Sequence, residues 1–365
     1  MKTLILPALY PGKNSGTGLL AQNLVDVLRS FQMESAVCTD ADSEIRRCTL
    51  FPARAPKISL AKRLENRDGR SYEQKLYLAG ALDEDYLKQD IQAVRTAIRE
   101  FQPDAVLSLG REAGLIAARL ENVPCWAAVH PGMLKRERIP VRYMAGLNQA
   151  LSACGLEQAL RILDLYSWSE KWLAFAPAGL ENFGAREVSR CRGLVTIPNP
   201  KPGTNKICIF FKNPPARAGA LNKILTDAFA GAPYEAMIWY EGSDAETIGN
   251  LHFSCDLRLS LLPGSIACIH DGSELLTQYC MALGIPQLVI TAPDCIRTSN
   301  GLALRKYGCG LHLPADSLKM GTLYENYRAL GADDAFDIRA QSLAAEYRAM
   351  PDLFRLASLL QERFH

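Results

Sequence analysis

The segment from Leu261 to Ile290 constrains the fold of this chain most strongly. It reads LLPGSIACIHDGSELLTQYCMALGIPQLVI, in which an apolar run meets a short turn containing Gly272. A segment with helical character follows, and a second apolar run ends at Ile290 after Gly284-Ile285-Pro286. The order strand, turn, helix, strand is typical of open α/β sheets, in which such turns often bind anions. The turn therefore predicts either an anion site or a plain connection between a strand and a helix.

The beginning of the chain predicts a second unit of the same kind. Residues 3–9 are apolar after Thr3, residues 19–31 carry an apolar stripe at helical spacing, and residues 34–39 predict another strand. Between the first strand and the helix lies YPGKNSGTG, a Gly-rich loop that contains Lys13 and lacks the ending of a Walker A motif. This loop is either part of a ligand-binding edge or a flexible connection.

The next predicted strands end in polar residues. Residues 104–108 predict a strand that leads into LGREAG and a helix, and residues 124–129 predict a strand that ends at His130. A lone histidine at a strand end is either a ligand contact or a structural imidazole. The basic residues between Lys135 and Arg142 indicate a solvated loop or a contact to an acceptor.

A proline-rich stretch, VTIPNPKPGTN, separates two halves that each alternate strands and helices. In the second half, residues 206–212 and 236–240 predict strands, and residues 343–364 predict a helix that is broken near Met350-Pro351. The expected fold class is α/β, with two doubly wound Rossmann-like domains facing each other across a cleft. The expected boundaries are an N-terminal domain over 1–197, a linker over 198–205, a C-terminal domain over 206–340 and a final helix over 341–365. We expect this helix to pack back on the N-terminal domain.

Composition restricts the function. The chain has 365 residues, a formal net charge of +2 and 11 cysteines without a CxxC pair. The weak net charge argues against nucleic-acid binding, and the cysteine pattern argues against a zinc site or a disulfide framework. The sequence predicts no metal, no transmembrane segment and no signal peptide. Reduced thiols favour a cytoplasmic location.

Several motifs, in order and spread over nearly the whole chain, resemble those of GT-B glycosyltransferases of family 1, the family of macrolide and antibiotic glycosyltransferases. The segment LLPGSIACIHDG is similar to the family's LLPxxDxvvhHGG, and ALGIPQLVI is similar to AxGVPQLVL. NGLALRKYGCGLHL resembles NAxxvxxxGxGxxL, and residues 147–156 resemble the helix lNxxLxxxGL. The resemblance implies the GT-B fold, with the acceptor bound by the N-terminal domain and a UDP- or dTDP-sugar bound as substrate by the C-terminal domain. It implies no tightly bound cofactor.

The residues that would act on the acceptor depart from the family pattern. Lys13 stands where the family has its catalytic histidine, which takes a proton from the acceptor hydroxyl. An ordinary lysine stays protonated at pH 7 and is a poor base. The acid that orients this histidine would lie near Leu109, and Glu112 is the nearest acid along the chain. The catalytic candidates are therefore Lys13 and Glu112, and the acceptor-side candidates are Tyr10, Asn14 and His130.

The donor site also departs from the pattern. The phosphate-binding histidine of the family falls at Asp271, which would repel a diphosphate unless a cation intervened. The adjacent His270 is an alternative phosphate ligand. The candidates for donor binding come from the ends of several predicted strands: Glu241, Ser243, His270, Asp271, Gly272, Ser273, Thr277, Asp294, Arg297 and Asn300.

Three functions remain open from the sequence. The first is transfer of a sugar from a nucleotide sugar to a small-molecule or glycan acceptor, with inversion at the anomeric carbon. The second is a non-catalytic relative that binds a ligand or assists a partner enzyme. The third is another GT-B chemistry, such as a sugar epimerase. A homodimer or a partner enzyme is compatible with each.

Overall fold

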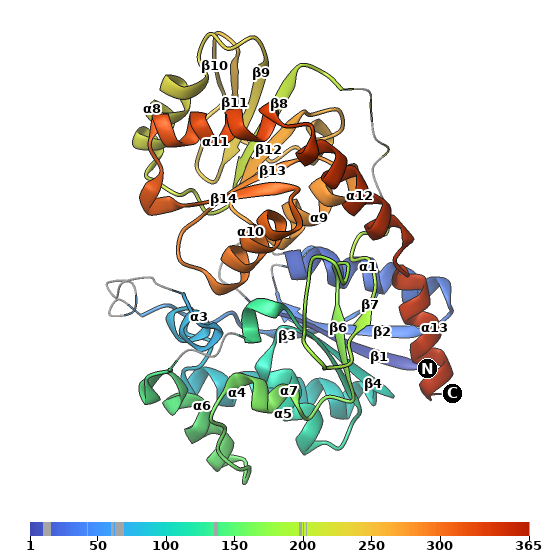
Figure 1. Ribbon diagram of the computed structural model, residues 1–365. Helices are drawn as coiled ribbons and strands as arrows, with labels where there is room; N and C mark the ends of the chain where they lie inside the picture. Colours follow the sequence, from blue (N-terminus) through green and yellow to red (C-terminus); the bar gives the residue numbers. More distant parts are fainter. Residues whose placement is uncertain are drawn as a thin grey trace. The chain divides into compact units, whose positions relative to one another are not determined.

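The structure is a computed structural model that describes residues 1–9, 16–41, 43–59, 62, 69–134, 138–196, 199, 201 and 203–364. Contacts group the chain into two compact units (Figure 1). Unit 1 comprises Met1–Phe175, Phe183–Val195 and Pro351–His365, and unit 2 comprises Ala176–Asn182 and Thr196–Met350. Each unit has its own sheet with helices around it, so the predicted α/β class with two doubly wound units is confirmed.

Unit 1 is built on a parallel sheet of seven strands among the described residues, in the order β3-β2-β1-β4-β5-β6-β7. Its central strands are buried and mostly apolar, as parallel strands covered on both faces require. Strand order reverses between β1 and β4, which pair in register from Thr3 with Ala105 to Pro7 with Leu109. The strands are β1 (Lys2–Pro7), β2 (Glu34–Asp40), β3 (Thr49–Ala53), β4 (Ala105–Leu109), β5 (Cys125–Ala128), β6 (Lys171–Ala174) and β7 (Ser189–Arg190).

The helices of unit 1 include the last helix of the chain. They are α1 (Gly16–Ser30), α3 (Tyr72–Leu78), α4 (Glu84–Phe101), α5 (Glu112–Leu120), α6 (Val141–Ala153), α7 (Ile162–Tyr166) and α13 (Leu353–Phe364). Helix α13, drawn red in Figure 1, buries Leu353, Leu356 and Leu360 in the same apolar core as Leu24 and Leu28 of α1.

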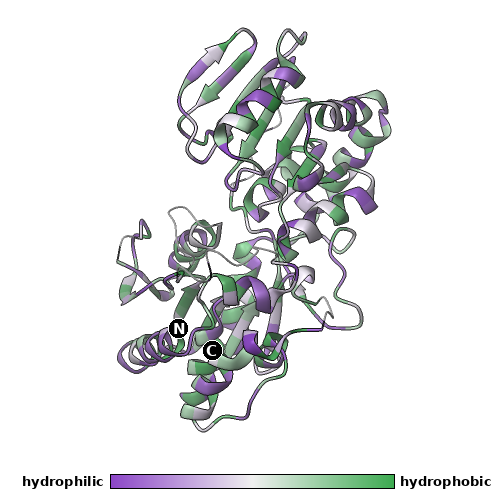
Figure 2. Ribbon diagram, turned by 90° about the vertical axis from the view of Figure 1, so that its left-hand side faces the viewer, coloured by the Kyte–Doolittle hydropathy of each residue, from purple (hydrophilic) through white to green (hydrophobic). Residues whose placement is uncertain are grey.

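Unit 2 repeats the central part of this strand order. Its seven-stranded sheet, counted over the described residues, has the order β10-β11-β9-β8-β12-β13-β14, and the order reverses between β8 and β12. Figure 2 shows the strands of both sheets as predominantly hydrophobic. The strands are β8 (Lys206–Phe211), β9 (Glu235–Tyr240), β10 (Glu246–Ile248), β11 (Leu251–Ser254), β12 (Ala267–His270), β13 (Gln287–Thr291) and β14 (Gly310–Pro314), and the helices are α8 (Ala218–Phe229), α9 (Glu274–Leu283), α10 (Cys295–Tyr307), α11 (Met320–Ala332) and α12 (Ala335–Ala349).

The segment from Leu261 to Ile290 forms β12, α9 and β13, as its pattern predicts. The predicted break near Met350-Pro351 is also present, because α12 ends at Ala349 and α13 begins at Leu353. The antiparallel hairpin of β10 and β11 was not expected. Its strands are short and β10 is exposed, so neither shows the apolar run that marks a buried strand, and only Gly249 with φ of 57° signals the turn.

We expect Leu360→Ala to lower the free energy of unfolding by about 2–5 kcal/mol, because this fully buried side chain joins α13 to the core of unit 1. Chemical denaturation monitored by circular dichroism measures the change. Glu362→Ala on the exposed side of the same helix is the control, with an expected change within about 1 kcal/mol. Equal effects of the two substitutions would show that α13 is not part of this core.

Candidate functional site

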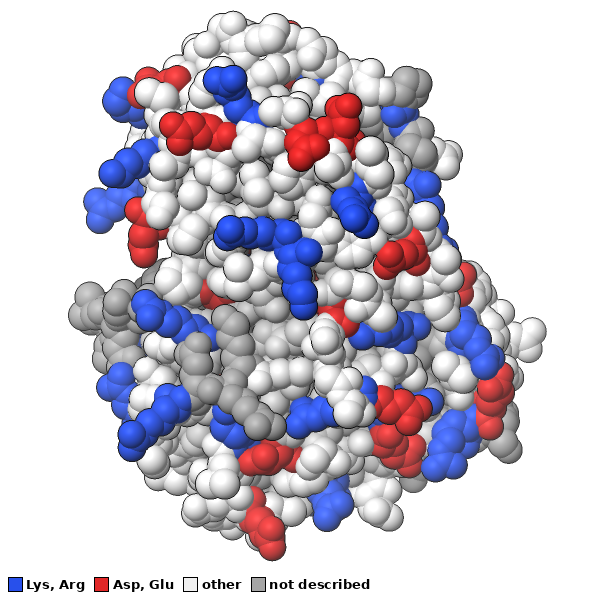
Figure 3. Space-filling view, viewed as in Figure 1, with Lys and Arg blue, Asp and Glu red and all other residues white. Residues whose placement is uncertain are grey.

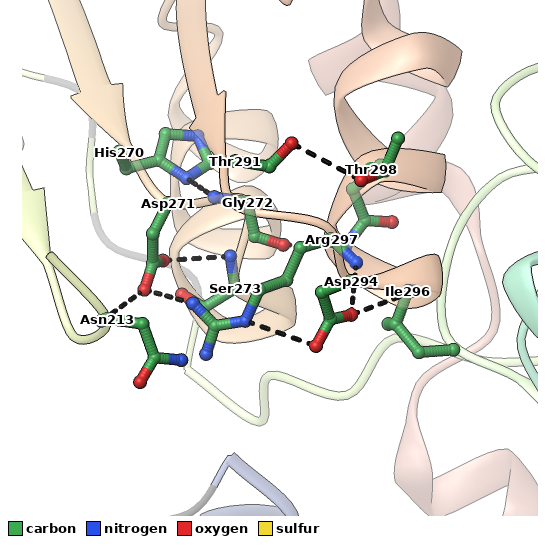
Figure 4. Close-up of polar contacts among 11 residues, drawn as sticks. Asn213, His270, Asp271, Gly272, Ser273, Thr291, Asp294, Ile296, Arg297 and Thr298 are labelled. Atoms are coloured by element: carbon green, nitrogen blue, oxygen red, sulfur yellow. Dashed lines mark hydrogen bonds and ion pairs between the residues drawn. The ribbon is translucent and has the colours of Figure 1, made fainter. Parts of the chain in front are cut away.

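Four strands of unit 2 end at one edge of its sheet, where the strand order reverses. Lys212 follows β8, Glu241 follows β9, Asp271 follows β12 and Asp294 follows β13. The carboxyl ends of parallel strands at such a reversal form the crevice in which open α/β sheets bind ligands. Helices α9 and α10 begin at the same edge, so the positive ends of their dipoles add to it (Figure 4).

Asp271 lies at the centre of this edge and is 1% exposed. Its Oδ2 accepts a hydrogen bond of 2.8 Å from the backbone N–H of Asn213, and its Oδ1 accepts one of 3.0 Å from the backbone N–H of Ser273. The guanidinium of Arg297 forms an ion pair with Oδ2 (Figure 4). The negative charge expected to repel a diphosphate is therefore paired with a cation from α10.

Arg297 is held in place by the first turn of α10. Asp294 caps this helix, and its Oδ1 accepts from the backbone N–H groups of Ile296 at 2.9 Å and Arg297 at 3.0 Å. Oδ2 of Asp294 lies 4.0 Å from Nε of Arg297. The two sequence candidates Asp294 and Arg297 are thus brought together with Asp271, and Asp294 acts here as a cap and a counter-charge.

His270 is fully buried at the end of β12. Its Nδ1 accepts from the backbone N–H of Gly272 at 3.1 Å, so Nε2 carries the proton and donates to Oε1 of Gln287 at 2.9 Å. Burial lowers the pKa of His270 and keeps the imidazole neutral. Both ring nitrogens are engaged inside the protein, so in this conformation the side chain fixes the shape of the turn.

The turn itself requires glycine at position 272. Gly272 has φ of 72°, and a Cβ there would lie 2.8 Å from the carbonyl oxygen of Arg297 and 2.9 Å from Val289. Nδ2 of Asn300 donates to the carbonyl oxygen of Gly272 at 3.0 Å. This close packing brings the start of α9 against the start of α10.

The N-terminus of α9 carries no side-chain cap. Ser273 occupies the N-cap position, and its side chain makes no such hydrogen bond to the first N–H groups of the helix. One turn later, Thr277 is 3% exposed and its Oγ1 has no hydrogen-bond partner among the described residues. An unpaired buried hydroxyl is costly, and a ligand oxygen is one group that would satisfy it.

Lys212 is a member of this edge that the sequence interpretation missed. It is half-buried, and its pKa is lowered by burial and by the neighbouring guanidinium of Arg297, while Glu241 and Asp271 act in the opposite direction. The available signal was its position, since Lys212 is the first charged residue after the apolar run ICIFF. Oγ of Ser243, by contrast, lies 2.7 Å from the carbonyl oxygen of Tyr240 and 2.6 Å from that of Ser254, so its one hydroxyl hydrogen is engaged within the protein.

The corresponding edge of unit 1 contains a buried acid. Glu112 begins α5, directly after β4, and is 4% exposed. The hydroxyl of Tyr72 donates to its Oε1 at 3.0 Å, and that of Tyr166 lies 3.5 Å away. Burial raises the pKa of Glu112 to about 7, although the hydrogen bond from Tyr72 opposes this rise. Glu112 is therefore poised to gain or lose a proton near neutral pH.

Glu112 lines a cavity of about 20 Å³, together with Leu9, Leu76, Tyr86 and Arg111. This is room for about one water molecule or one hydroxyl group. Arg111 forms a buried ion pair with Asp90 and donates to the carbonyl oxygen of Cys38. The pair was not expected, because its members lie 21 residues apart and no local pattern joins them.

The acceptor-side candidates are only partly described. His130 is 7% exposed, and its Nδ1 accepts from the backbone N–H of Gly132 at 2.9 Å. Lys13, Tyr10 and Asn14 lie outside the described residues.

The described part of the chain contains no cluster of three or more side chains suited to a metal ion. None of its helices is both long and apolar enough to cross a membrane. Figure 3 shows acidic and basic side chains interspersed over the displayed face, without a continuous basic surface there.

The fold is that of solved glycosyltransferases. VinC, solved in complex with dTDP, is 17% identical with a TM-score of 0.75, covering 100% of this chain and 99% of that chain. The calicheamicin glycosyltransferase CalG4 is 15% identical with a TM-score of 0.76, covering 99% and 98%. The spinosyn rhamnosyltransferase SpnG, complexed with thymidine diphosphate, is 18% identical with a TM-score of 0.72, covering 99% and 100%. No protein-family model and no curated protein matches the sequence. The GT-B fold expected from the motifs is thus confirmed over the whole chain.

We expect the stability of unit 1 to fall as pH rises from about 4.5 to 7, because the folded state holds the proton of Glu112 more tightly than the unfolded chain does. The raised pKa corresponds to a loss of about 3 kcal/mol, complete above pH 7. Glu112→Gln should remove this contribution. Denaturation of both proteins at pH 5 and pH 8 measures it, and a wild-type minus variant difference that does not change with pH would contradict the buried acid.

Proposed function

We propose that the protein is a glycosyltransferase that moves a sugar from a UDP- or dTDP-sugar to a hydroxyl group of a small-molecule or glycan acceptor. The observation that carries this proposal is the convergence of Lys212, Arg297 and the N-termini of α9 and α10 at the edge where the strand order of unit 2 reverses. Two cationic side chains and two positive helix ends suit a diphosphate. The likeness to VinC with dTDP and to SpnG with thymidine diphosphate supports the same donor class.

The transfer is a single displacement. The acceptor oxygen attacks the anomeric carbon, the bond from that carbon to the diphosphate oxygen breaks, and the diphosphate leaves with the electron pair. Inversion at the anomeric carbon follows. Lys212, Arg297 and the first N–H groups of α9 stabilise the charge that develops on the leaving diphosphate.

The remaining candidates complete the donor site in this proposal. Gly272 lets the backbone approach the phosphates, while Ser273 and Thr277 offer hydroxyl groups at the start of α9. Glu241 and Ser243 lie at the end of β9, where the nucleoside is expected. His270 and Asn300 hold the turn, and Asp294 holds α10.

Glu112 is the proposed general base. A base acts best when its pKa lies near the working pH, and that of Glu112 is raised to about 7. The cavity that Glu112 lines has the size of a hydroxyl group.

Lys13 is proposed to neutralise diphosphate charge or to bind an anionic acceptor. Tyr10, Asn14 and His130 are proposed to contact the acceptor.

We place the reaction in the cytoplasm, since all eleven cysteines are free thiols, as suits a reducing compartment. That the protein forms a homodimer or acts together with a partner enzyme stays a prediction.

We expect UDP or dTDP to stabilise the protein against thermal unfolding, by about 2.7 kcal/mol at 100 times the dissociation constant. Lys212→Ala should weaken nucleoside diphosphate binding about tenfold or more, because it removes a charge-assisted contact. Lys223→Ala removes the same charge from the exposed face of α8 and is the matched control, with unchanged binding. Thermal scans and calorimetry measure both effects. The absence of any thermal shift with UDP, dTDP, GDP or the corresponding nucleotide sugars would contradict the proposed donor site.

We expect the rate of transfer to rise with pH through about 7, as Glu112 loses its proton, and to level off above it. Glu112→Gln should reduce kcat by about 10²–10⁴-fold and abolish the rise. Tyr72→Phe removes a hydrogen bond that lowers the pKa of Glu112, so it should move the rise to higher pH while transfer persists. The test is the pH dependence of the transfer rate, measured with a nucleotide sugar that the enzyme uses. A pH dependence that is unshifted in Tyr72→Phe would exclude Glu112 as the base.

A further inference from the structure

The carboxylate of Asp271 occupies an arrangement of donors that is suited to an exogenous anion. Its two oxygens accept from the backbone N–H of Asn213, which follows β8, and from that of Ser273, which begins α9. Arg297 of α10 supplies the cation. Donors from three separate elements thus meet on one buried carboxylate, which is 1% exposed (Figure 4).

These are the groups that a phosphate would use at this edge. A phosphate oxygen and a carboxylate oxygen accept the same backbone N–H and guanidinium hydrogen bonds. The two N–H groups and the guanidinium that Asp271 engages are withheld from a ligand. A diphosphate placed beside the paired carboxylate would also meet a like charge at short range, where repulsion amounts to several kcal/mol.

We propose that Asp271 is an internal occupant of the diphosphate subsite, and that the donor binds by exchanging with its carboxylate. This inference rests on the proposed function, because it concerns how that same site takes its donor. On exchange, the N–H groups of Asn213 and Ser273 and the guanidinium of Arg297 pass from the carboxylate to the phosphate. Asp271 thereby sets the affinity of the site for anions.

Two neighbouring groups favour exchange over permanent closure of the site. Lys212 lies close enough to Asp271 and Arg297 for both to affect its pKa. It supplies a second cation for a ligand that carries more negative charge than a carboxylate. Oγ1 of Thr277, buried in the first turn of α9, has no partner among the described residues while Asp271 fills the site. A diphosphate carries more oxygens than the carboxylate of Asp271, so it can also engage Lys212 and Oγ1 of Thr277.

The test compares the full chain with Asp271→Asn and Asp271→Ser. Calorimetry measures the binding of dTDP, UDP and inorganic pyrophosphate to each protein. Both substitutions remove the competing charge, and serine also removes the reach of the side chain, so each should bind these anions at least tenfold more tightly than the wild type. Asp244→Asn, which removes an exposed carboxylate after β9, is the charge-matched control and should bind like the wild type.

A measurement on the wild type makes the test independent of how the variants fold. In a ¹⁵N-labelled sample titrated with pyrophosphate, exchange predicts that the amide resonances of Asn213 and Ser273 shift together, because both change their acceptor. If pyrophosphate binds without moving them, the inference is overturned.

The outcomes separate this inference from the proposed function. Nucleotide binding and sugar transfer in the wild type with no gain in the Asp271 variants would overturn the exchange and leave the glycosyltransferase standing. Tighter pyrophosphate binding in the variants, without any response to nucleotides or their sugars, would support the exchange and overturn the glycosyltransferase. No anion binding in any folded variant would overturn both.

Discussion

The parallel hydrogen bonding of the two sheets determines where chemistry can occur in this protein. Because neighbouring strands other than β10 run in the same direction, their carboxyl ends lie at one edge, and the turns that follow them are delivered to the same place. In unit 2 this edge collects residues that are up to 82 positions apart in the chain, from Lys212 to Asp294. The apolar strands between the layers bring no polar chemistry themselves. Their packing holds the turns still, so that a few side chains at the ends can act together.

The buried carboxyl groups at the carboxyl-terminal edges of the two sheets are stabilised in two ways. In unit 2, Arg297 neutralises Asp271, and in unit 1, Arg111 neutralises Asp90. Glu112 has no such cation in its immediate hydrogen bonds, which come from phenolic hydroxyls, and its carboxyl group responds by holding its proton more tightly. Pairing fixes a charge in place, whereas the absence of a pair leaves a group free to change its protonation state. The protein thus pairs two buried carboxylates with arginines and leaves the carboxyl group of Glu112 to respond through its pKa.

The sequence was sufficient for the fold and for the strand, turn and helix around Gly272, because both depend on local periodicity and on turn residues. It was insufficient for the partners of individual side chains. His270 was considered for a phosphate contact, and only the structure shows that Gln287 and Gly272 occupy its nitrogens. The pairing of Asp90 with Arg111 and the proximity of Lys212 to Arg297 depend on contacts across the fold, which no spacing along the chain encodes. The hairpin of β10 and β11 was missed because exposed short strands lack apolar periodicity.

The position of α13 has a consequence for how the protein is made. Most of unit 1 precedes unit 2 in the sequence, yet part of its core is supplied by Leu353, Leu356 and Leu360, which follow unit 2. On the ribosome, the sheet of unit 1 is translated long before these leucines emerge, and its core stays open until they do. Unit 2, which draws no residue from beyond Met350, can close first. The order of folding during translation is therefore expected to be the reverse of the usual N-to-C order, with unit 1 exposed to chaperones and proteases in the interval.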